Sequence, residues 1–197
     1  MKLYYSPIAC SLADHIALRE AGIAFTHERV DLRTRRTETG ADFVAINPKG
    51  YVPALLLDDG ALLTENVAVL DWIAGQAPVL QVEGALGRTR VLEMLTYITT
   101  EIHRAYKPLW HQSEEAQKAA ARASIQTLFR PIAAKLSAPY LFGAAPSVAD
   151  FYLFVMLLWA KRFAIDLPET LVALRERMLA RPAVREAMIV EGLLDAA

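Results

Sequence analysis

The order of the apolar patterns in the first 77 residues restricts the possible folds of this chain more than any other feature. Residues 2–6 and 25–30 read as short strands, and residues 11–21 between them repeat apolar side chains at helical spacing. Two strands joined through a helix pair in parallel by a crossover connection. Two more apolar runs flank residues 58–60, an Asp-Asp-Gly turn typical of antiparallel hairpins, and Thr64 caps another helix. With a short helical segment before Asn47-Pro48, the order β-α-β-α-β-β-α predicts a mixed sheet with helices packed against it.

The rest of the chain reads as helices. Residues 77–87 contain Pro78 and two glycines without a regular period, and they form the expected linker. Helical patterns then cover residues 88–110, 113–136, 147–165 and 169–192, the last interrupted at Pro182. We therefore expect an α/β thioredoxin-like domain over residues 1–77 and an all-α domain over residues 86–197.

The composition indicates a globular protein of the cytoplasm. Apolar residues make up 54% of the chain and charged residues 22%, which supports a sizeable core. The net charge of −1 argues against nucleic acid or an anionic membrane as the main partner, because both attract a surplus of Lys and Arg. The first residues lack the features of a signal peptide. One cysteine cannot close a disulfide within the chain, so we expect a reducing compartment.

The most apolar segment, residues 151–160, follows a capping box formed by Ser147 and Asp150. A membrane span needs roughly 20 such residues, and this run is much shorter. We therefore expect a helix buried at the centre of the second domain.

The single cysteine, Cys10, stands just before the first helix. Unpaired N–H groups and the helix dipole at such a position favour a thiolate, which predicts a lowered pKa. The alternative is a buried cysteine that serves only as a small apolar side chain. No second cysteine follows in a C-x-x-C pattern, so any redox role of Cys10 needs an external thiol.

Two further segments can take part in binding. Pro53 precedes an apolar strand, and a cis bond after Val52 would present the Val52 backbone to an extended peptide, whereas a trans bond is the more common case. Glu65 and Asn66 open the helix after Thr64. Glu65 either only complements the helix dipole or binds a ligand ammonium, while the helix terminus receives the neighbouring carboxylate.

Taken together, these segments resemble the cytosolic glutathione transferases, and most closely the bacterial beta class. The resemblance extends over essentially the whole chain. It is carried by Ala9-Cys10-Ser11-Leu12-Ala13 with residues 15–20, Asn47-Pro48-Lys49-Gly50 with Val52-Pro53-Ala54-Leu55, Leu63-Thr64-Glu65, Glu101 with His103, Ser147 with Asp150, and Arg181-Pro182-Ala183-Val184 with Glu191-Gly192-Leu193.

The resemblance implies a homodimer that binds glutathione as a co-substrate. It places Cys10 close to the glutathione sulfur, able to form a mixed disulfide, and assigns catalytic roles to His103 and, as a hydroxyl donor, to Ser11. The glutathione-binding residues that it implies are Arg35, Tyr51, Val52, cis-Pro53, Glu65, Asn66 and Arg104. Tyr5 and Ser6 are alternatives for activating glutathione.

This chain departs from the class pattern at three positions. Ile8 stands where a glycine usually precedes Ala9-Cys10, Asn66 takes the place of a small residue, and Thr96 replaces an asparagine seven residues before His103. No metal is expected, because the four histidines show no ligand spacing.

These features predict an enzyme that conjugates glutathione to small hydrophobic electrophiles, as in detoxification. The expected electrophile pocket is lined by Ile8, Tyr106, Trp110 and Phe163, although apolar residues at helical spacing also form plain core. The alternatives are a non-catalytic, regulatory relative of these transferases and a glutathione-dependent dehalogenase or isomerase on the same scaffold.

Overall fold

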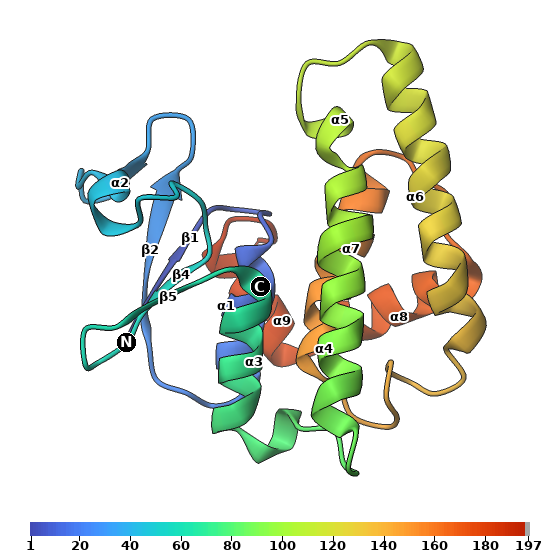
Figure 1. Ribbon diagram of the computed structural model, residues 1–197, viewed down its shortest axis with the longest axis horizontal. Coiled ribbons are helices and arrows are strands. Elements are labelled where there is room, and N and C mark those ends of the chain that lie inside the picture. The colour runs from blue at the N-terminus through green and yellow to red at the C-terminus, as the bar shows by residue number, and fades with distance from the viewer. Residues whose placement is uncertain (196–197) are drawn as a thin grey trace. The chain divides into compact units, whose positions relative to one another are not determined.

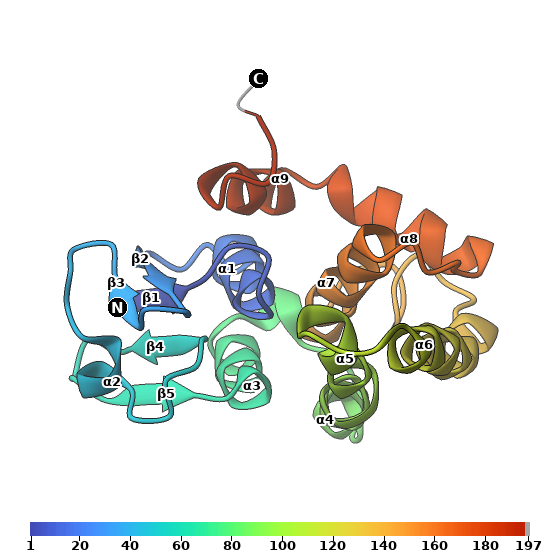
Figure 2. The same cartoon turned by 90° about the horizontal axis from the view of Figure 1, so that it is seen from above.

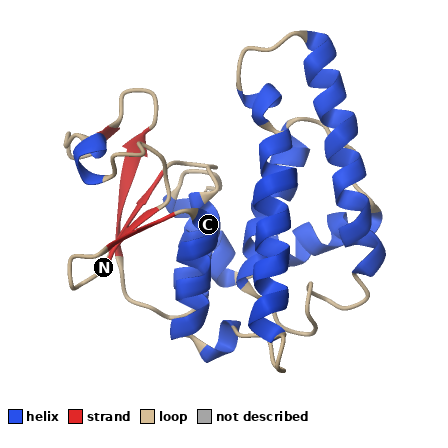
Figure 3. Cartoon of the chain, viewed as in Figure 1, coloured by secondary structure: helices blue, strands red, loops and turns tan. Residues whose placement is uncertain are grey.

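The structure is a computed structural model that describes residues 1–195. The chain forms two compact units. The first combines Met1–Gln81 with the C-terminal segment that begins at Ala180, and the second spans Val82–Leu179. Figure 3 shows that the strands all lie in the first unit, whereas the second is built from helices and loops. The predicted fold class, a thioredoxin-like domain with an all-helical partner, is confirmed.

The first unit contains a five-stranded mixed sheet with the strand order β3-β2-β1-β4-β5. β1 pairs in parallel with β2, and the other pairs are antiparallel. The strands are β1 (Lys2–Tyr5), β2 (Thr26–Asp31), β3 (Arg36–Thr37), β4 (Ala54–Leu56) and β5 (Leu62–Thr64). The crossover and the hairpin were both predicted, but β3 was not, because its two residues are too short for a recognisable alternation.

Helices cover both faces of this sheet (Figure 2). The helices of this unit are α1 (Ser11–Glu20), α2 (Phe43–Ile46), α3 (Asn66–Gln76), the 3₁₀ helix η1 (Pro78–Leu80) and α9 (Pro182–Val190). Helices α1 and α3 lie side by side on one face, and α2 lies on the other, where Phe43 packs with Tyr4, Val30, Val52 and Ala54. The helix predicted near the C-terminus is present as α9. It was expected in the all-helical domain, but it packs against α1 and belongs to the unit that contains the sheet.

The second unit consists of α4 (Gly87–Tyr97), the π-helix η2 (Ile98–His103), α5 (Lys107–Trp110), α6 (Glu115–Lys135), α7 (Val148–Arg162) and α8 (Glu169–Leu179) (Figure 1). The single helix predicted over residues 88–110 is therefore divided into three segments. π-Helical turns are rare and cannot be recognised from apolar spacing alone.

Helix α7 is the buried helix predicted from the apolar run. Twelve of its residues are buried, and the predicted capping box at its start is present. The Ser147 N–H and hydroxyl both donate to Asp150 Oδ2 over 2.8 Å, and the Leu141 N–H donates to Oδ1 over 2.8 Å. Among residues 1–195, no helix combines the length and apolar character needed to cross a membrane.

Candidate functional site

Cys10 lies at the end of a tight turn between β1 and α1. The Ala9 N–H closes this turn on the Ser6 carbonyl over 3.0 Å, and Ile8 takes a left-handed conformation with φ of 61°. A β-branched residue rarely adopts such a backbone, which explains the glycine of the class pattern at this position. Cys10 itself already has helical dihedral angles, so its side chain projects from the first turn of α1.

The predicted lowering of the Cys10 pKa is wrong. Burial raises the pKa of the thiol to about 12, and the Asp14 carboxyl one helical turn later raises it further. The N–H groups of Cys10 and Ser11 at the helix start act in the opposite direction, as expected, but their effect is smaller. The position of Cys10 at a helix start correctly predicts that the backbone N–H groups lower its pKa. Burial of the sulfur has a larger, opposite effect and decides the direction of the net pKa shift.

The Cys10 thiol donates to the Val52 carbonyl over 3.7 Å, so Cys10 and the Val52-Pro53 segment lie against each other. The peptide bond between Val52 and Pro53 is cis. The buried Asn47 side chain fixes the loop before it, because its Nδ2 donates to the Tyr51 carbonyl over 2.8 Å and its Oδ1 accepts the Lys49 N–H over 3.2 Å. Asn47 was part of the recognised motif but not of the predicted site.

Glu65 and Asn66 stand at the start of α3, as predicted, but the N-cap residue is Glu65 and not Thr64, which ends β5. Glu65 has a left-handed φ of 71° and an exposed carboxylate, which pairs with Lys49 Nζ over 2.7 Å. Asn66 is buried, and neither its Nδ2 nor its Oδ1 has a hydrogen-bond partner among the described residues. Buried amides without partners are rare in native proteins and call for a ligand or water. We name Cys10, Val52, Glu65 and Asn66 the Cys10 cluster.

The remaining predicted residues of this unit have distinct surroundings. The Arg35 guanidinium packs so closely on Gly50 that a Cβ there would collide with it, and Tyr51 is 69% exposed. Ser11 is buried, and its hydroxyl accepts the Ser6 N–H over 3.3 Å and donates to the Ser6 carbonyl over 3.5 Å. The structure therefore gives the Ser11 hydroxyl a role in holding the turn before Cys10.

Sequence reasoning missed a group of buried ionisable residues behind this turn. The Glu191 carboxylate accepts the Ile8 N–H over 3.2 Å and contacts His15 Nδ1 over 3.1 Å. Burial raises the pKa of Glu191 to about 8 and lowers that of His15 to about 3. Asp14, fully buried without a hydrogen-bond partner in residues 1–195, has a pKa raised well above its usual range by burial. The burial of Asp14, His15 and Glu191 could not be predicted from the neighbouring residues in the sequence, because charged and polar side chains are usually exposed.

His103 closes the π-helix η2 of the second unit. Its Nδ1 contacts the Tyr152 hydroxyl over 2.6 Å, and its ring meets the edge of Trp159 with 4.9 Å between centroids. Burial lowers the pKa of His103 to about 4, so the imidazole is neutral at physiological pH. Arg104 beside it is exposed.

The residues expected to line the electrophile pocket differ in exposure. Tyr106 is fully buried, and its hydroxyl donates to the Met156 carbonyl over 2.8 Å. Trp110 and Phe163 meet edge to face with 4.9 Å between ring centroids. Tyr106 therefore belongs to the core of the second unit, whereas Trp110 and Phe163 are half-buried.

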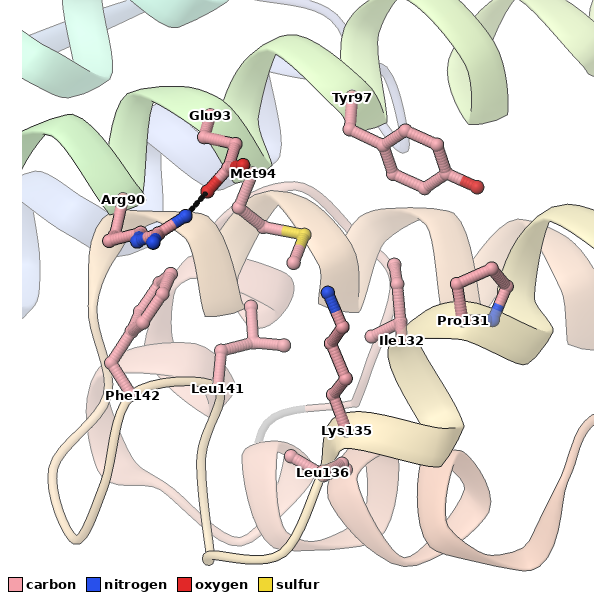
Figure 4. A pocket seen from close by; sticks show the side chains of 10 residues that line it. All are labelled: Arg90, Glu93, Met94, Tyr97, Pro131, Ile132, Lys135, Leu136, Leu141 and Phe142. Carbon is pink, nitrogen blue, oxygen red and sulfur yellow. Dashed lines mark hydrogen bonds and ion pairs between the residues drawn. The ribbon is translucent and has the colours of Figure 1, made fainter.

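A separate pocket of about 480 Å³ lies on the second unit, between α4 and α6 (Figure 4). Its polar side chains include Arg90 and Glu93, which pair over 2.8 Å, and Lys135. None of the predicted site residues lines it. Within residues 1–195, no group of His, Cys, Asp and Glu side chains could hold a metal ion.

Comparison with known proteins agrees with the fold. The family model of the glutathione S-transferase N-terminal domain matches residues 9–76, and that of the C-terminal domain matches residues 92–182. Glutathione S-transferase GstA of Escherichia coli O157:H7 is 42% identical over 98% of this chain and all of its own length. Glutathione S-transferase GST-4.5 of Xanthomonas campestris is 37% identical over the same shares.

Solved structures give the same result. The bacterial transferase BphK, in a ternary complex, superposes with a TM-score of 0.93 at 44% identity, covering 98% of this chain and 100% of its own. The chain belongs to the glutathione S-transferase family and is an enzyme of that family. Its class is the bacterial beta class, since the beta-class transferase of Sphingomonas chungbukensis matches with a TM-score of 0.92 and 44% identity over 98% of this chain and 100% of its own.

Proposed function

We propose that this transferase conjugates glutathione to small hydrophobic electrophiles and binds the tripeptide at the Cys10 cluster. The observation that carries the proposal is the 3.7 Å contact between the Cys10 thiol and the Val52 carbonyl, with Glu65 and the unpartnered Asn66 in the same unit. In this arrangement, the backbone of Val52 pairs with the cysteinyl residue of glutathione, as an added strand would.

Cys10 acts as a hydrogen-bond donor in this proposal. Because its pKa is raised to about 12, Cys10 keeps its proton at physiological pH. Its S–H donates to the thiolate of the bound glutathione, which favours the charged form of the ligand's sulfur. The glutathione thiolate then attacks the electrophilic carbon and the leaving group departs with its electron pair, so that Cys10 is unchanged at the end.

The charged groups orient the ligand. Glu65 binds the α-ammonium of the γ-glutamyl residue, the Asn66 amide and the start of α3 receive its carboxylate, and Arg35 with the neighbouring Tyr51 binds the glycine end. Neutral His103 accepts the proton of the glutathione thiol, and Arg104 contributes a positive charge to glutathione binding. These roles follow the resemblance to the beta class.

A second reaction of Cys10 follows from the same arrangement. Attack of the Cys10 thiolate on a glutathione disulfide would form a Cys10–glutathione mixed disulfide and release one glutathione, which takes up the proton lost from Cys10. The raised pKa makes this reaction slow at neutral pH. We further propose that the protein is a homodimer of the cytoplasm. The enzymatic names of its relatives do not favour a non-catalytic regulatory protein.

Binding and turnover measured together test this function. Retention on immobilised glutathione and conjugation of a chlorodinitrobenzene are compared for the wild type, Cys10→Ala and His103→Ala, with the exposed His111→Ala as the matched control. We expect binding and turnover in the wild type, reduced turnover in both site variants and no change in His111→Ala. Binding without any turnover in the wild type would contradict the conjugation reaction, and no retention would contradict the glutathione site.

A further inference from the structure

Lys49 makes a charged contact at the start of α3 that the proposed function does not use. Its ammonium donates to Glu65 Oε1 over 2.7 Å and to Thr64 Oγ1 over 3.0 Å. Both charged side chains are largely exposed, 52% for Lys49 and 68% for Glu65. An exposed ion pair of this kind stabilises a fold only slightly. The contact is therefore easily rearranged when a charged ligand arrives.

The position of Lys49 is set by its backbone. The Lys49 N–H donates to Asn47 Oδ1 over 3.2 Å, and the Gly50 N–H donates to the Asn47 carbonyl over 2.8 Å. Asn47 is itself only 2% exposed, so the loop is anchored in the interior of the unit. The fixed backbone delivers a flexible, charged side chain to the rim of the Cys10 cluster.

The Lys49–Glu65 pair retains unused hydrogen-bonding capacity. An ammonium has three donors, and two of those of Lys49 are engaged. Glu65 Oε2 accepts no hydrogen bond from any residue between 1 and 195, which leaves one carboxylate oxygen for a ligand. The pair therefore offers one free donor on a positive group and one free acceptor on a negative group, close together.

The start of α3 adds donors for an anion beside this pair. The first N–H groups of a helix have no acceptor within the helix and attract negative charge, and α3 is eleven residues long. Asn66 is 7% exposed, and its side-chain amide has no partner among the described residues. A buried amide left unpaired is a second, independent indication that a polar ligand group belongs here.

A ligand that carries an ammonium and a carboxylate on one carbon matches this set of groups. Glu65 alone would attract the ammonium but repel the adjacent carboxylate, since the two negative charges would lie a few ångströms apart. A positive Lys49 beside Glu65 balances that repulsion. With Lys49 present, the ligand ammonium lies beside the Glu65 carboxylate and the ligand carboxylate lies beside the Lys49 ammonium, so each charge has a neighbour of opposite sign.

We propose that Lys49 is a specificity-determining residue, whose ammonium pairs with the α-carboxylate of the γ-glutamyl group while Glu65 holds its α-ammonium. The inference rests on the proposed glutathione site and adds the ligand feature that the site selects, a free zwitterionic γ-glutamyl end. Peptides whose terminal amine is acylated or whose α-carboxyl is amidated bind poorly.

Dissociation constants measured by calorimetry test this role. The ligands are glutathione, 4-aminobutanoyl-Cys-Gly, which lacks the α-carboxylate, and glutaryl-Cys-Gly, which lacks the α-amine. The proteins are the wild type, Lys49→Met and Lys118→Met. The last is a matched control because Lys118 forms a similar ion pair with Glu115 over 2.8 Å on α6. Thermal melting confirms that each variant is folded.

We expect Lys49→Met to raise the dissociation constants of glutathione and glutaryl-Cys-Gly by about threefold to fivefold, which corresponds to the loss of one exposed ion pair. Binding of 4-aminobutanoyl-Cys-Gly should stay unchanged, and added salt should reduce the difference between wild type and variant. Lys118→Met should bind all three ligands as the wild type does.

Three results would overturn the inference while leaving the glutathione site intact. An equal rise in the dissociation constants of all three ligands would show that Lys49 affects binding only through the conformation of its loop. Unchanged binding of glutathione would show that it takes no part, and tighter binding would show that it competes with the ligand for Glu65. A wild-type protein that binds no glutathione would instead refute the proposed function, and this inference with it.

Discussion

The Ile8 N–H donates to Glu191 Oε2 over 3.2 Å, which joins residues 183 positions apart at the turn that leads into Cys10. The other carboxylate oxygen of Glu191 contacts His15 Nδ1 on α1 over 3.1 Å. Glu191, which follows α9, therefore fixes the strained turn through the Ile8 N–H. The Cys10 thiol, at the end of the same turn, donates to the Val52 carbonyl.

The buried Glu191–His15 pair should make stability depend on pH. The pKa of Glu191 is raised from 4.5 to about 8 and that of His15 is lowered from 6.5 to about 3, so the folded pair holds one proton between pH 3 and 8. Unfolded, the pair loses its last proton near pH 6.5, the ordinary value of His15. The folded state therefore binds more protons between pH 6.5 and 8, and its stability falls as pH rises through that window by about 2 kcal/mol.

Urea denaturation of the wild type and Glu191→Gln at several pH values measures this fall. The glutamine keeps an acceptor for the Ile8 N–H but cannot titrate, so the difference between the two proteins should vary across the window. Parallel stability curves for the two proteins would contradict the assignment of the proton to this pair.

Replacement of Ile8 by glycine should stabilise the protein. The left-handed φ of 61° costs a β-branched residue about 1–2 kcal/mol, and part of this gain is offset by the greater freedom of glycine in the unfolded chain. We expect Ile8→Gly to gain about 0.5–1 kcal/mol in the free energy of unfolding. Removal of the side chain should also speed alkylation of Cys10.

Ala164→Gly is the matched control, because Ala164 has a φ of 52° and lies in the second unit. Ala164→Gly should raise the free energy of unfolding without any change in the alkylation rate of Cys10. A loss of stability in Ile8→Gly would show that the Ile8 side chain packs more favourably than its backbone strain costs.

Cys10 should react slowly with iodoacetamide. With its pKa raised to about 12, the thiolate fraction at pH 8 is small, and we expect alkylation about 100-fold slower than that of an unhindered thiol. The Asp14 carboxyl raises the pKa of Cys10, so Asp14→Asn should lower that pKa and increase the alkylation rate.

Mass spectrometry of the alkylated chain gives these rates without interference, because Cys10 is the only cysteine. The exposed Asp166→Asn should behave as the wild type. Equal rates in Asp14→Asn and the wild type up to pH 10 would show that Asp14 has no electrostatic influence on Cys10.

The capping box of α7 should contribute measurably to stability. Ser147→Ala removes the hydroxyl that donates to Asp150 over 2.8 Å and caps the helix, which should cost about 1–2 kcal/mol. Asp150→Ala should cost about 3 kcal/mol, because it leaves the N–H groups of Leu141 and Ser147 unpaired in a buried site. Chemical denaturation checks both, with the exposed Ser137→Ala as control. Similar stability in all three variants would mean that water replaces the lost contacts.

Local patterns determined much of this protein. The period-two runs, the Asp-Asp-Gly turn and the S-x-x-D box each depend on residues within a few positions of one another, so β1, the β4–β5 hairpin and the start of α7 could be predicted. The same holds for the position of Cys10 at a helix start, and the recognised motifs pointed to the family.

Contacts between distant residues decided the rest. The sign of the Cys10 pKa shift reversed because burial outweighed the helix N–H groups, and burial is a property of the packed unit. Glu191 joined Ile8 and His15, and Lys49 joined Glu65, only because separate segments were brought together by the sheet and by α9. The sequence alone therefore determined the elements and the chemical groups at their ends, whereas the tertiary structure decided which of those groups carry a proton and which charges meet.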